Sequence, residues 1–301
     1  MLKLRLLCAA VLLLISGVWS EPFDDGPKQQ PSPHFRTALE LERKGDLNGA
    51  ISEYRQAVKE TPLHADSHYN LARLLAARRD YADAVAEYRQ AAKINPNDAD
   101  IHSNLGLALK NTGDLDGSAA EYREALRLNP NHPEAHVNLG NILYVKKDVK
   151  GAMAEYRTAI KINPQNAIAH MSLGNALDDS GDTDGAIFEY REAALLQPTN
   201  ANAHYNLAIS LAKKKDGEGA VSELREAARL APDWFLPHMW LATLLVKSDP
   251  HGALDECLTA EKIASEPRVK ELCNRLELVV KKRLFRHFSG LRSQVQTSTV
   301  E

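Results

Sequence analysis

The sequence predicts an all-α solenoid in which helical hairpins stack side by side. The first observation is a repeat of 34 residues, a period typical of solenoids. Six full copies and a shortened seventh begin at Pro31, Ala65, Ala99, Pro133, Ala167, Ala201 and Phe235. The second observation is that each copy holds two amphipathic halves. In the fourth copy, Leu139 and Leu143 mark the buried side of a first helix, and Tyr156 and Ala159 mark that of a second.

The composition agrees with a folded protein that has a large core. The chain has 301 residues, of which 44% are hydrophobic, and a formal net charge of -3. Proteins that bind nucleic acid usually carry an excess of basic residues, whereas the net charge of this chain is slightly negative. We therefore expect no nucleic-acid partner.

The first twenty residues predict export from the cytosol. Lys3 and Arg5 precede an apolar run from Leu6 to Trp19, which ends at the small residue Ser20. A basic start, a short apolar core and a small residue at the boundary are typical of a secretory signal peptide. An uncleaved membrane anchor is the alternative, although the run is shorter than the ~20 residues of a membrane span. We expect a periplasmic or secreted protein.

The predicted organisation follows from these boundaries. It comprises a signal peptide (residues 1–20), a Pro-rich linker (21–33), six full repeats (31–64, 65–98, 99–132, 133–166, 167–200 and 201–234, together 31–234), a degenerate seventh repeat (235–266), a capping helix (267–287) and a disordered tail (288–301). The cap is expected because the last repeat of a solenoid has no neighbour to cover it.

Regular residues mark where the helices begin and end. An aspartate at position sixteen of each full copy is placed to cap the second helix: Asp46, Asp80, Asp114, Asp148, Asp182 and Asp216. Gly45, Gly113 and Gly181 precede it in alternate copies, where glycine tolerates a left-handed turn. The other copies have Arg79, Lys147 and Lys215, so we expect them to end the first helix differently. A proline at position thirty-two ends each second helix.

Position by position, this frame resembles the tetratricopeptide repeat. The matching features are a small residue at position eight, alanine at twenty, an aromatic residue at twenty-four, alanine at twenty-seven and proline at thirty-two. Ser118 and Leu224 depart mildly from this pattern, and histidine occupies position four, where the family often has tryptophan. The resemblance implies a right-handed superhelix that binds other proteins without catalysis.

Histidine occupies position four in every copy: His34, His68, His102, His136, His170, His204 and His238. Equivalent points on packed helices lie about 8–10 Å apart, so neighbouring histidines are too distant to share a zinc ion. We interpret them as partly buried structural residues. The recurring Glu-Tyr-Arg triplets are interpreted as a solvated helix face. No catalytic or cofactor-binding motif is evident, so we predict no enzyme activity, cofactor or metal.

The opposite face of the first helix is the candidate binding surface. Positions two, six, nine and thirteen cluster there and point toward the inner wall of the predicted superhelix. Asparagine amides can pair with the backbone of an extended peptide whatever its sequence. The row resembles the asparagine ladder of O-linked N-acetylglucosamine transferase, although Ser172 interrupts it. The predicted peptide-binding residues are Asn70, Asn104, Asn138, Asn141, Asn175, Asn206, Arg73, Asp100, Glu134 and Asp179.

Two further inferences concern the partner and the cysteines. Chaperone-binding relatives clamp a terminal carboxylate with lysine at position five, and no copy here has that lysine. Cys257 and Cys273 lie symmetrically about residue 265, where the last repeat should turn into the cap. We expect either a disulfide or two separately buried thiols there.

The predicted function is a protein-interaction scaffold that binds an extended segment of a partner in its groove and is monomeric without ligand. The alternative is a structural spacer that assembles through its terminal repeats.

Overall fold

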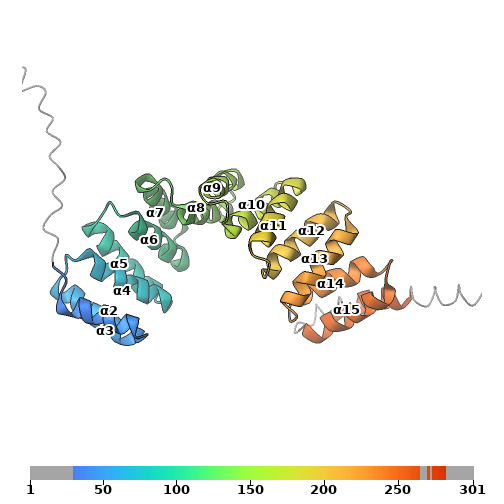
Figure 1. The fold of residues 1–301 in the computed structure, drawn as a ribbon, viewed down its shortest axis with the longest axis horizontal. Helices are drawn as coiled ribbons and strands as arrows, with labels where there is room; N and C mark the ends of the chain where they lie inside the picture. Colours follow the sequence, from blue (N-terminus) through green and yellow to red (C-terminus); the bar gives the residue numbers. More distant parts are fainter. Residues whose placement is uncertain (1–29, 265–269, 272, 283–301) are drawn as a thin grey trace, which may run out of the picture. The chain divides into compact units, whose positions relative to one another are not determined.

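The structure is a computed structural model and describes residues 30–264, 270–271 and 273–282. The predicted signal peptide, most of the predicted linker and the predicted tail lie outside these residues. The described elements are helices, with no strand among them, and consecutive helices pack as pairs. The predicted all-α repeat fold is confirmed (Figure 1). Within the described part of the chain, no helix has the length and hydrophobicity needed to cross a lipid bilayer.

The described chain forms two compact units, divided between Asn97 and Asp98. The N-terminal unit contains α2 (Pro33–Arg43), α3 (Leu47–Glu60), α4 (Ala65–Ala77) and α5 (Tyr81–Ile94). The C-terminal unit contains α6 (Ala99–Thr112), α7 (Leu115–Leu128), α8 (Pro133–Val145), α9 (Val149–Ile162), α10 (Ala167–Asp179), α11 (Thr183–Leu196), α12 (Ala201–Lys213), α13 (Gly217–Leu230), α14 (Phe235–Leu245) and α15 (Pro250–Ile263). Even-numbered helices are the first helices of their copies, and odd-numbered helices are the second.

The recurring spacing of aspartate and glycine explains how the second helices begin. In α7, for example, the Asp114 carboxylate accepts a hydrogen bond from the Gly117 backbone N–H at 2.8 Å. The same bond recurs at Asp46, Asp148, Asp182, Asp216 and Asp249. In α5, Asp83 occupies the glycine position, and the Asp80 carboxylate makes no capping bond and pairs with Arg78 at 3.3 Å. A side chain at this position crowds the cap, because a Cβ on Gly117 would lie 2.4 Å from Asp114.

The first helices end in the same way in all six full copies, contrary to the sequence prediction. Gly45, Gly113 and Gly181 have φ between 81° and 89°. Arg79, Lys147 and Lys215 were expected to close differently, but their φ values are 67°, 67° and 66°. The chain reverses direction within two residues of the helix end. The backbone N–H of the residue after the turn then donates a hydrogen bond to a carbonyl of the first helix, as Asp148 does to Leu143 at 2.9 Å. This bond outweighs the side chain's preference for negative φ.

We expect Lys147→Gly to stabilise the protein by about 1 kcal/mol, because a left-handed conformation costs a residue with a Cβ about 1–2 kcal/mol and costs glycine little. The reciprocal change Gly113→Lys should destabilise it by a similar amount. Urea denaturation of both variants measures the two effects. If both substitutions changed the free energy of unfolding in the same direction, the assigned cost of the left-handed conformation would be wrong.

Small residues and tyrosines fill the space between the paired helices. Tyr156 is 1% exposed, and its ring lies against Gly140 on the preceding helix. Tyr122 and Tyr190 lie in the same way against Gly106 and Gly174. The core of the C-terminal unit continues across copies, because buried side chains from α8 to α13 form one cluster. The copies formed by α8 to α13 therefore cover one another's apolar faces.

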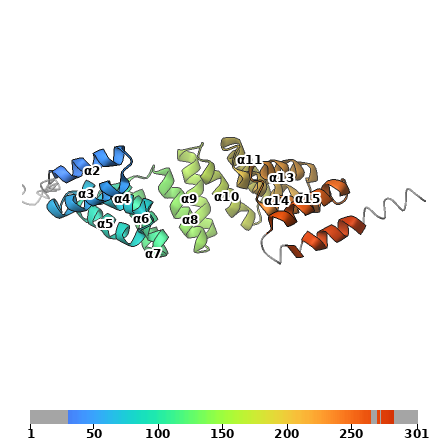
Figure 2. The ribbon, with the colours of Figure 1, turned by 90° about the horizontal axis from the view of Figure 1, so that it is seen from below.

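The C-terminal end is covered by a helical segment, residues 270–271 and 273–282, which lies within the predicted cap (Figure 2). Val280 is fully buried in a cluster with Cys257 and Leu241. Cys273 packs with Met239 and donates a hydrogen bond to its sulfur at 3.2 Å. Both cysteines are free thiols in the structure, which corresponds to the second of the two alternatives. Burial raises the pKa of the Cys257 thiol to about 11, so the reactive thiolate is disfavoured.

Candidate binding surface

The first helices of the C-terminal unit present a continuous stripe that their second helices do not cover. We call positions two, six, nine and thirteen of α6, α8, α10 and α12 the first-helix stripe. Its residues are Asp100, Asn104, Leu107, Asn111, Glu134, Asn138, Asn141, Val145, Ile168, Ser172, Asn175, Asp179, Asn202, Asn206, Ile209 and Lys213. All are exposed or half-buried, whereas the positions between them on α8, such as Leu139 and Ile142, are buried. Val145 and Ile168 are large apolar residues, 58% and 57% exposed.

Hydrogen bonds join neighbouring first helices along this stripe. Asn206 on α12 donates to the Asn175 oxygen on α10 at 3.1 Å. Tyr144 on α8 donates to the Asp179 carboxylate on α10, and burial, together with this bond, raises the pKa of Tyr144 to about 12. The Lys213 ammonium reaches the Asp178 carboxylate at 2.6 Å. These bonds fix the spacing of the stripe before any ligand binds.

Two of the predicted peptide-binding asparagines also support the fold. The Tyr156 hydroxyl donates to the Asn141 oxygen at 2.8 Å, and the Tyr190 hydroxyl donates to the Asn175 oxygen at 2.7 Å. Their amide N–H groups remain the groups that could meet a ligand. Asn104 donates to the Asp100 carbonyl of its own helix at 2.8 Å. The Asn138 amide makes no hydrogen bond to any described residue, so both its donor and its acceptor are available.

The third copy shows what the asparagine at position nine does. There Leu107 occupies the position, and the hydroxyl of Tyr122 is buried without a hydrogen-bond partner among the described residues. An unpaired buried hydroxyl is unfavourable. Asparagine at this position therefore has a structural role in addition to any contact with a ligand.

We expect the same substitution to have opposite effects in the two copies. Tyr156→Phe should destabilise the protein by about 1 kcal/mol, because Asn141 loses its hydrogen-bond donor. Tyr122→Phe removes an unpaired hydroxyl and should be neutral or stabilising. Urea midpoints of the two variants provide the measurement. An equal loss of stability in both would contradict the role assigned to Asn141.

The two acidic residues at position two are held together by a histidine. His132 lies 3.4 Å from the Asp100 carboxylate and 3.1 Å from the Glu134 carboxylate. Both carboxylates are well exposed, at 74% and 65%. The structure thus brings the predicted residues Asp100 and Glu134 into one cluster at the N-terminal ends of α6 and α8.

The remaining predicted residues lie in the N-terminal unit. Asn70 is half-buried on α4. Arg73, one turn further along, forms an ion pair with Glu42 on α2, which also accepts a hydrogen bond from the Tyr54 hydroxyl at 3.3 Å. Arg73 is therefore already bound within the fold. The structure places these two residues on the equivalent face of their own unit.

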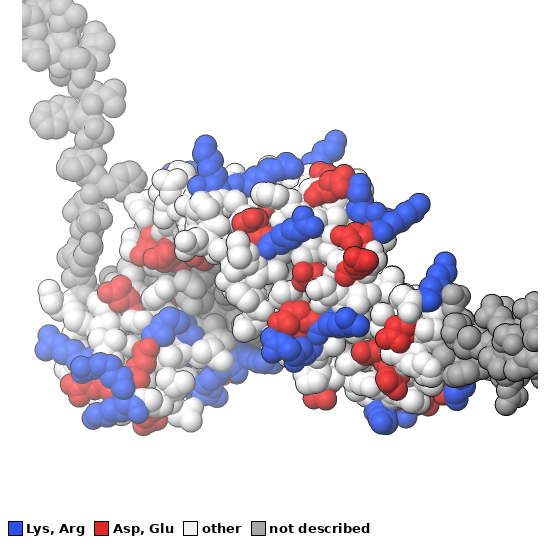
Figure 3. Space-filling view, turned by 45° about the vertical axis from the view of Figure 1, so that its right-hand side comes forward, with Lys and Arg blue, Asp and Glu red and all other residues white. Residues whose placement is uncertain are grey.

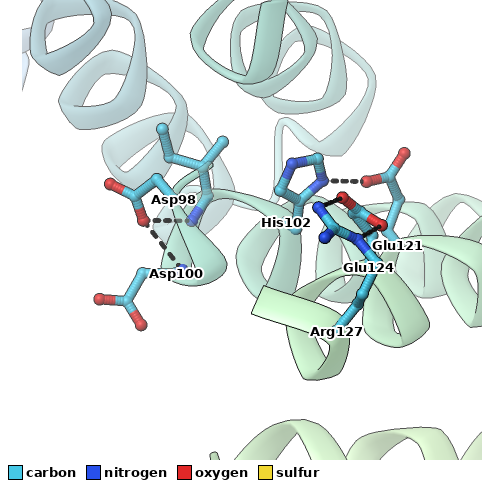
Figure 4. A network of polar contacts seen from close by, with 7 residues as sticks. Asp98, Asp100, His102, Glu121, Glu124 and Arg127 are labelled. Atoms are coloured by element: carbon cyan, nitrogen blue, oxygen red, sulfur yellow. Dashed lines mark hydrogen bonds and ion pairs between the residues drawn. The ribbon is translucent and has the colours of Figure 1, made fainter. Parts of the chain in front are cut away.

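The histidines at position four each have a partner that the sequence analysis missed. Nδ1 of every one lies 2.5–2.7 Å from a glutamate on the second helix of the same copy. In the first five copies this is the glutamate of the Glu-Tyr-Arg triplet. The glutamates, in chain order, are Glu53, Glu87, Glu121, Glu155, Glu189, Glu223 and Glu256. Figure 4 shows the pair in the third copy, beside the exposed Glu124–Arg127 pair. We call this series the His–Glu ladder.

The ladder corrects the interpretation of the triplets as a solvated face. The glutamate side chains are partly buried, between 14% and 29% exposed. In four copies the second ring nitrogen lies 3.0–3.1 Å from a proline carbonyl of the preceding copy. A signal was present in the sequence, because histidine and glutamate recur with the same period. Their spacing is 19 residues, or 18 in the last copy.

We expect the pKa of His34 to lie above the ordinary value of about 6.5, because its ring nitrogen is hydrogen-bonded to the Glu53 carboxylate; Glu60 adds to this effect and burial opposes it. A raised histidine pKa stabilises the fold below the unfolded-state pKa, and the contribution is lost as pH rises through the folded-state pKa. NMR titration should show this pKa falling in Glu53→Gln. His64, whose pKa is lowered mainly by burial, is the internal control. A His34 pKa at or below that of His64 would contradict the assignment.

Among the described residues, no group of three or more histidine, cysteine, aspartate or glutamate side chains is placed to hold a metal ion. On the face drawn in Figure 3, acidic and basic side chains are interspersed and form no large field of one sign. The first-helix stripe itself combines amide and charged side chains with single exposed apolar residues such as Val145 and Ile168.

The fold and the stripe define a class, the helical-repeat scaffold. Sequence profiles of the tetratricopeptide repeat match residues 35–99, 103–167 and 87–118, and a TPR repeat profile matches 174–215. Together they cover more than half of the chain, which belongs to the tetratricopeptide repeat family. Proteins of this family generally bind other proteins.

Solved structures with the same fold include three distant relatives. PilF of Pseudomonas aeruginosa is 19% identical, with a TM-score of 0.62 over 70% of this chain and 97% of that one. A tetratricopeptide repeat protein from Parabacteroides merdae is 15% identical, with a TM-score of 0.59 over 82% and 97%. YrrB, described as having an unusual peptide-binding site, is 23% identical, with a TM-score of 0.52 over 61% and 95%. No curated protein matches the chain. At these identities the likeness shows the fold alone.

Proposed function

We propose that this protein is a non-catalytic scaffold that binds an extended segment of a partner protein along the first-helix stripe. The main observation behind the proposal is that hydrogen bonds between the first helices hold the stripe in place, while several of its side chains have no partner among the described residues. The hydrogen bonds between α8, α10 and α12 hold the stripe in place. Asn138 and the exposed side chains of Val145 and Ile168 are left for a ligand. A preformed surface lowers the ordering cost of binding.

The character of the stripe favours a peptide over a small molecule. Small-molecule sites are concave and mostly apolar. Here amide groups alternate with single apolar side chains along successive helices, which suits a segment that offers both backbone and side chains. YrrB, which has the same fold, is described as having a peptide-binding site, and this supports the same use of the fold here. The basic and apolar N-terminal sequence supports action outside the cytosol.

Site-specific photocrosslinking tests the proposal in cells. A benzophenone amino acid at Val145 or Ile168 should yield adducts with the partner, and the same group at exposed Arg157 on α9 should not. Asn138→Ala should reduce the adducts formed from Val145 while leaving the circular dichroism spectrum unchanged. Adducts of equal yield from all three positions, or from Arg157 alone, would contradict binding along the stripe.

Self-assembly through the terminal repeats is the competing function. Sedimentation of the purified protein separates the two, because a stripe that binds a foreign segment predicts a monomer at micromolar concentration. A concentration-dependent series of oligomers would favour assembly.

A further inference from the structure

The N-terminal unit has a separate surface hollow with its own chemistry. The hollow has a volume of about 530 Å³ and is lined by Arg36, Leu39, Glu40, Glu42, Arg43 and Arg73. It lies between α2 and α4, where Arg36, Leu39 and Arg43 occupy positions six, nine and thirteen of α2. These are the positions that form the first-helix stripe in the C-terminal unit, so the inference rests on the proposed function and specifies the partner's chemistry in the N-terminal unit.

Two arginines of this hollow have no counter-ion. Glu42 neutralises Arg73. Arg36 and Arg43 are exposed and form no ion pair or hydrogen bond with any described residue. Glu40 is also without an ion-pair partner, so the hollow keeps a net positive charge after the internal pair is removed. The two glutamates disfavour a densely charged polyanion and favour isolated anionic groups.

The spacing of the two arginines fits an extended peptide. They are seven residues apart on α2, which places their Cα atoms about 10.5 Å apart along one helix face. In a polyproline II segment, residues three apart lie on the same face and span about 9 Å. Leu39 lies between the arginines and is 39% exposed, so an apolar side chain can meet it. The guanidinium group binds carboxylates through two parallel hydrogen bonds.

We propose that this hollow binds an acidic segment of a partner protein, in which two carboxylate side chains three residues apart meet Arg36 and Arg43. An apolar side chain between them packs on Leu39. The contact is charge-assisted and open to solvent, so its affinity falls as salt concentration rises.

Fluorescence anisotropy on the full chain tests the proposal. The probe is a labelled ten-residue peptide with two glutamates three apart and a leucine between them. Arg36→Gln/Arg43→Gln should weaken its binding at least tenfold. The matched control is Lys59→Gln/Lys93→Gln, which removes two exposed charges from α3 and α5 of the same unit and should change affinity less than twofold. A peptide with glutamine in place of glutamate should bind at least tenfold more weakly.

Three outcomes would overturn the inference. They are equal affinity for the glutamate and glutamine peptides, equal loss in the two double variants, and no binding of the glutamate peptide at millimolar concentration. Circular dichroism confirms that each variant is folded. Photocrosslinks from Val145 and Ile168 report on the other unit, so failure of this inference is distinguishable from failure of the proposed function.

Discussion

Glu155→Ala should lower the free energy of unfolding by about 2 kcal/mol, an unusually large effect for one polar residue on a helix surface. Glu155 lies 2.6 Å from Nδ1 of His136, and their side chains are 26% and 11% exposed. Nε2 of the same ring lies 3.0 Å from the Pro130 carbonyl. Hydrogen bonds to charged groups contribute about 1.5–3 kcal/mol, and removing one partner leaves the other half-buried and unpaired.

A double-mutant cycle separates the pair from its surroundings. His136→Ala and Glu155→Ala should each destabilise, and the double variant should lose less than the sum of the two. Glu226→Ala is the matched control, because its partner Arg229 is 67% exposed and such surface pairs contribute little to stability. An additive cycle, or an equal loss in the control, would show that the His–Glu ladder is incidental.

The sequence determined the helix boundaries well because each boundary depends on local chemistry. An aspartate before a helix accepts a hydrogen bond from the backbone N–H three residues later, and a proline prevents a helix from continuing. The closing turn at Lys147 was predicted wrongly for the same reason. Lysine by itself favours a negative φ. The positive φ at Lys147 accompanies the hydrogen bond that the Asp148 N–H donates to the Leu143 carbonyl across the turn.

Contacts between helices were less accessible to sequence reasoning. The helical period places His136 and Glu155 on their respective helices, but the rotation of one helix against the other decides whether they meet. That rotation is set by packing of Tyr156 against Gly140. The asparagines illustrate the same limit. Their row could be seen in the sequence, whereas the hydrogen bond from Tyr156 to Asn141 depends on how deep the tyrosine lies.

Gly140→Ala should destabilise the protein by about 2 kcal/mol, although alanine is the better helix former by about 1 kcal/mol. A Cβ at residue 140 would lie 2.5 Å from Cε1 of Tyr156, and the ring cannot retreat because its hydroxyl is bonded to Asn141. Overpacking of this kind costs about 1–3 kcal/mol. Gly106→Ala is the matched comparison. Its Cβ would lie 3.1 Å from Tyr122, whose hydroxyl is unbonded, so that variant should be neutral or slightly stabilised.

The sixth copy supplies a rescue for this defect. There alanine at the glycine position, Ala208, accompanies leucine at the tyrosine position, Leu224, and both are fully buried. In the first two copies alanine accompanies a buried tyrosine, but position nine holds Leu39 or Arg73 instead of an asparagine like the one bonded to Tyr156. Gly140→Ala/Tyr156→Leu should therefore be more stable than the sum of its single substitutions predicts, because the shorter side chain accommodates the methyl group. Urea denaturation of the four proteins measures the coupling. If Gly140→Ala were as stable as Gly106→Ala, contact with the tyrosine ring could not be what requires glycine at this position.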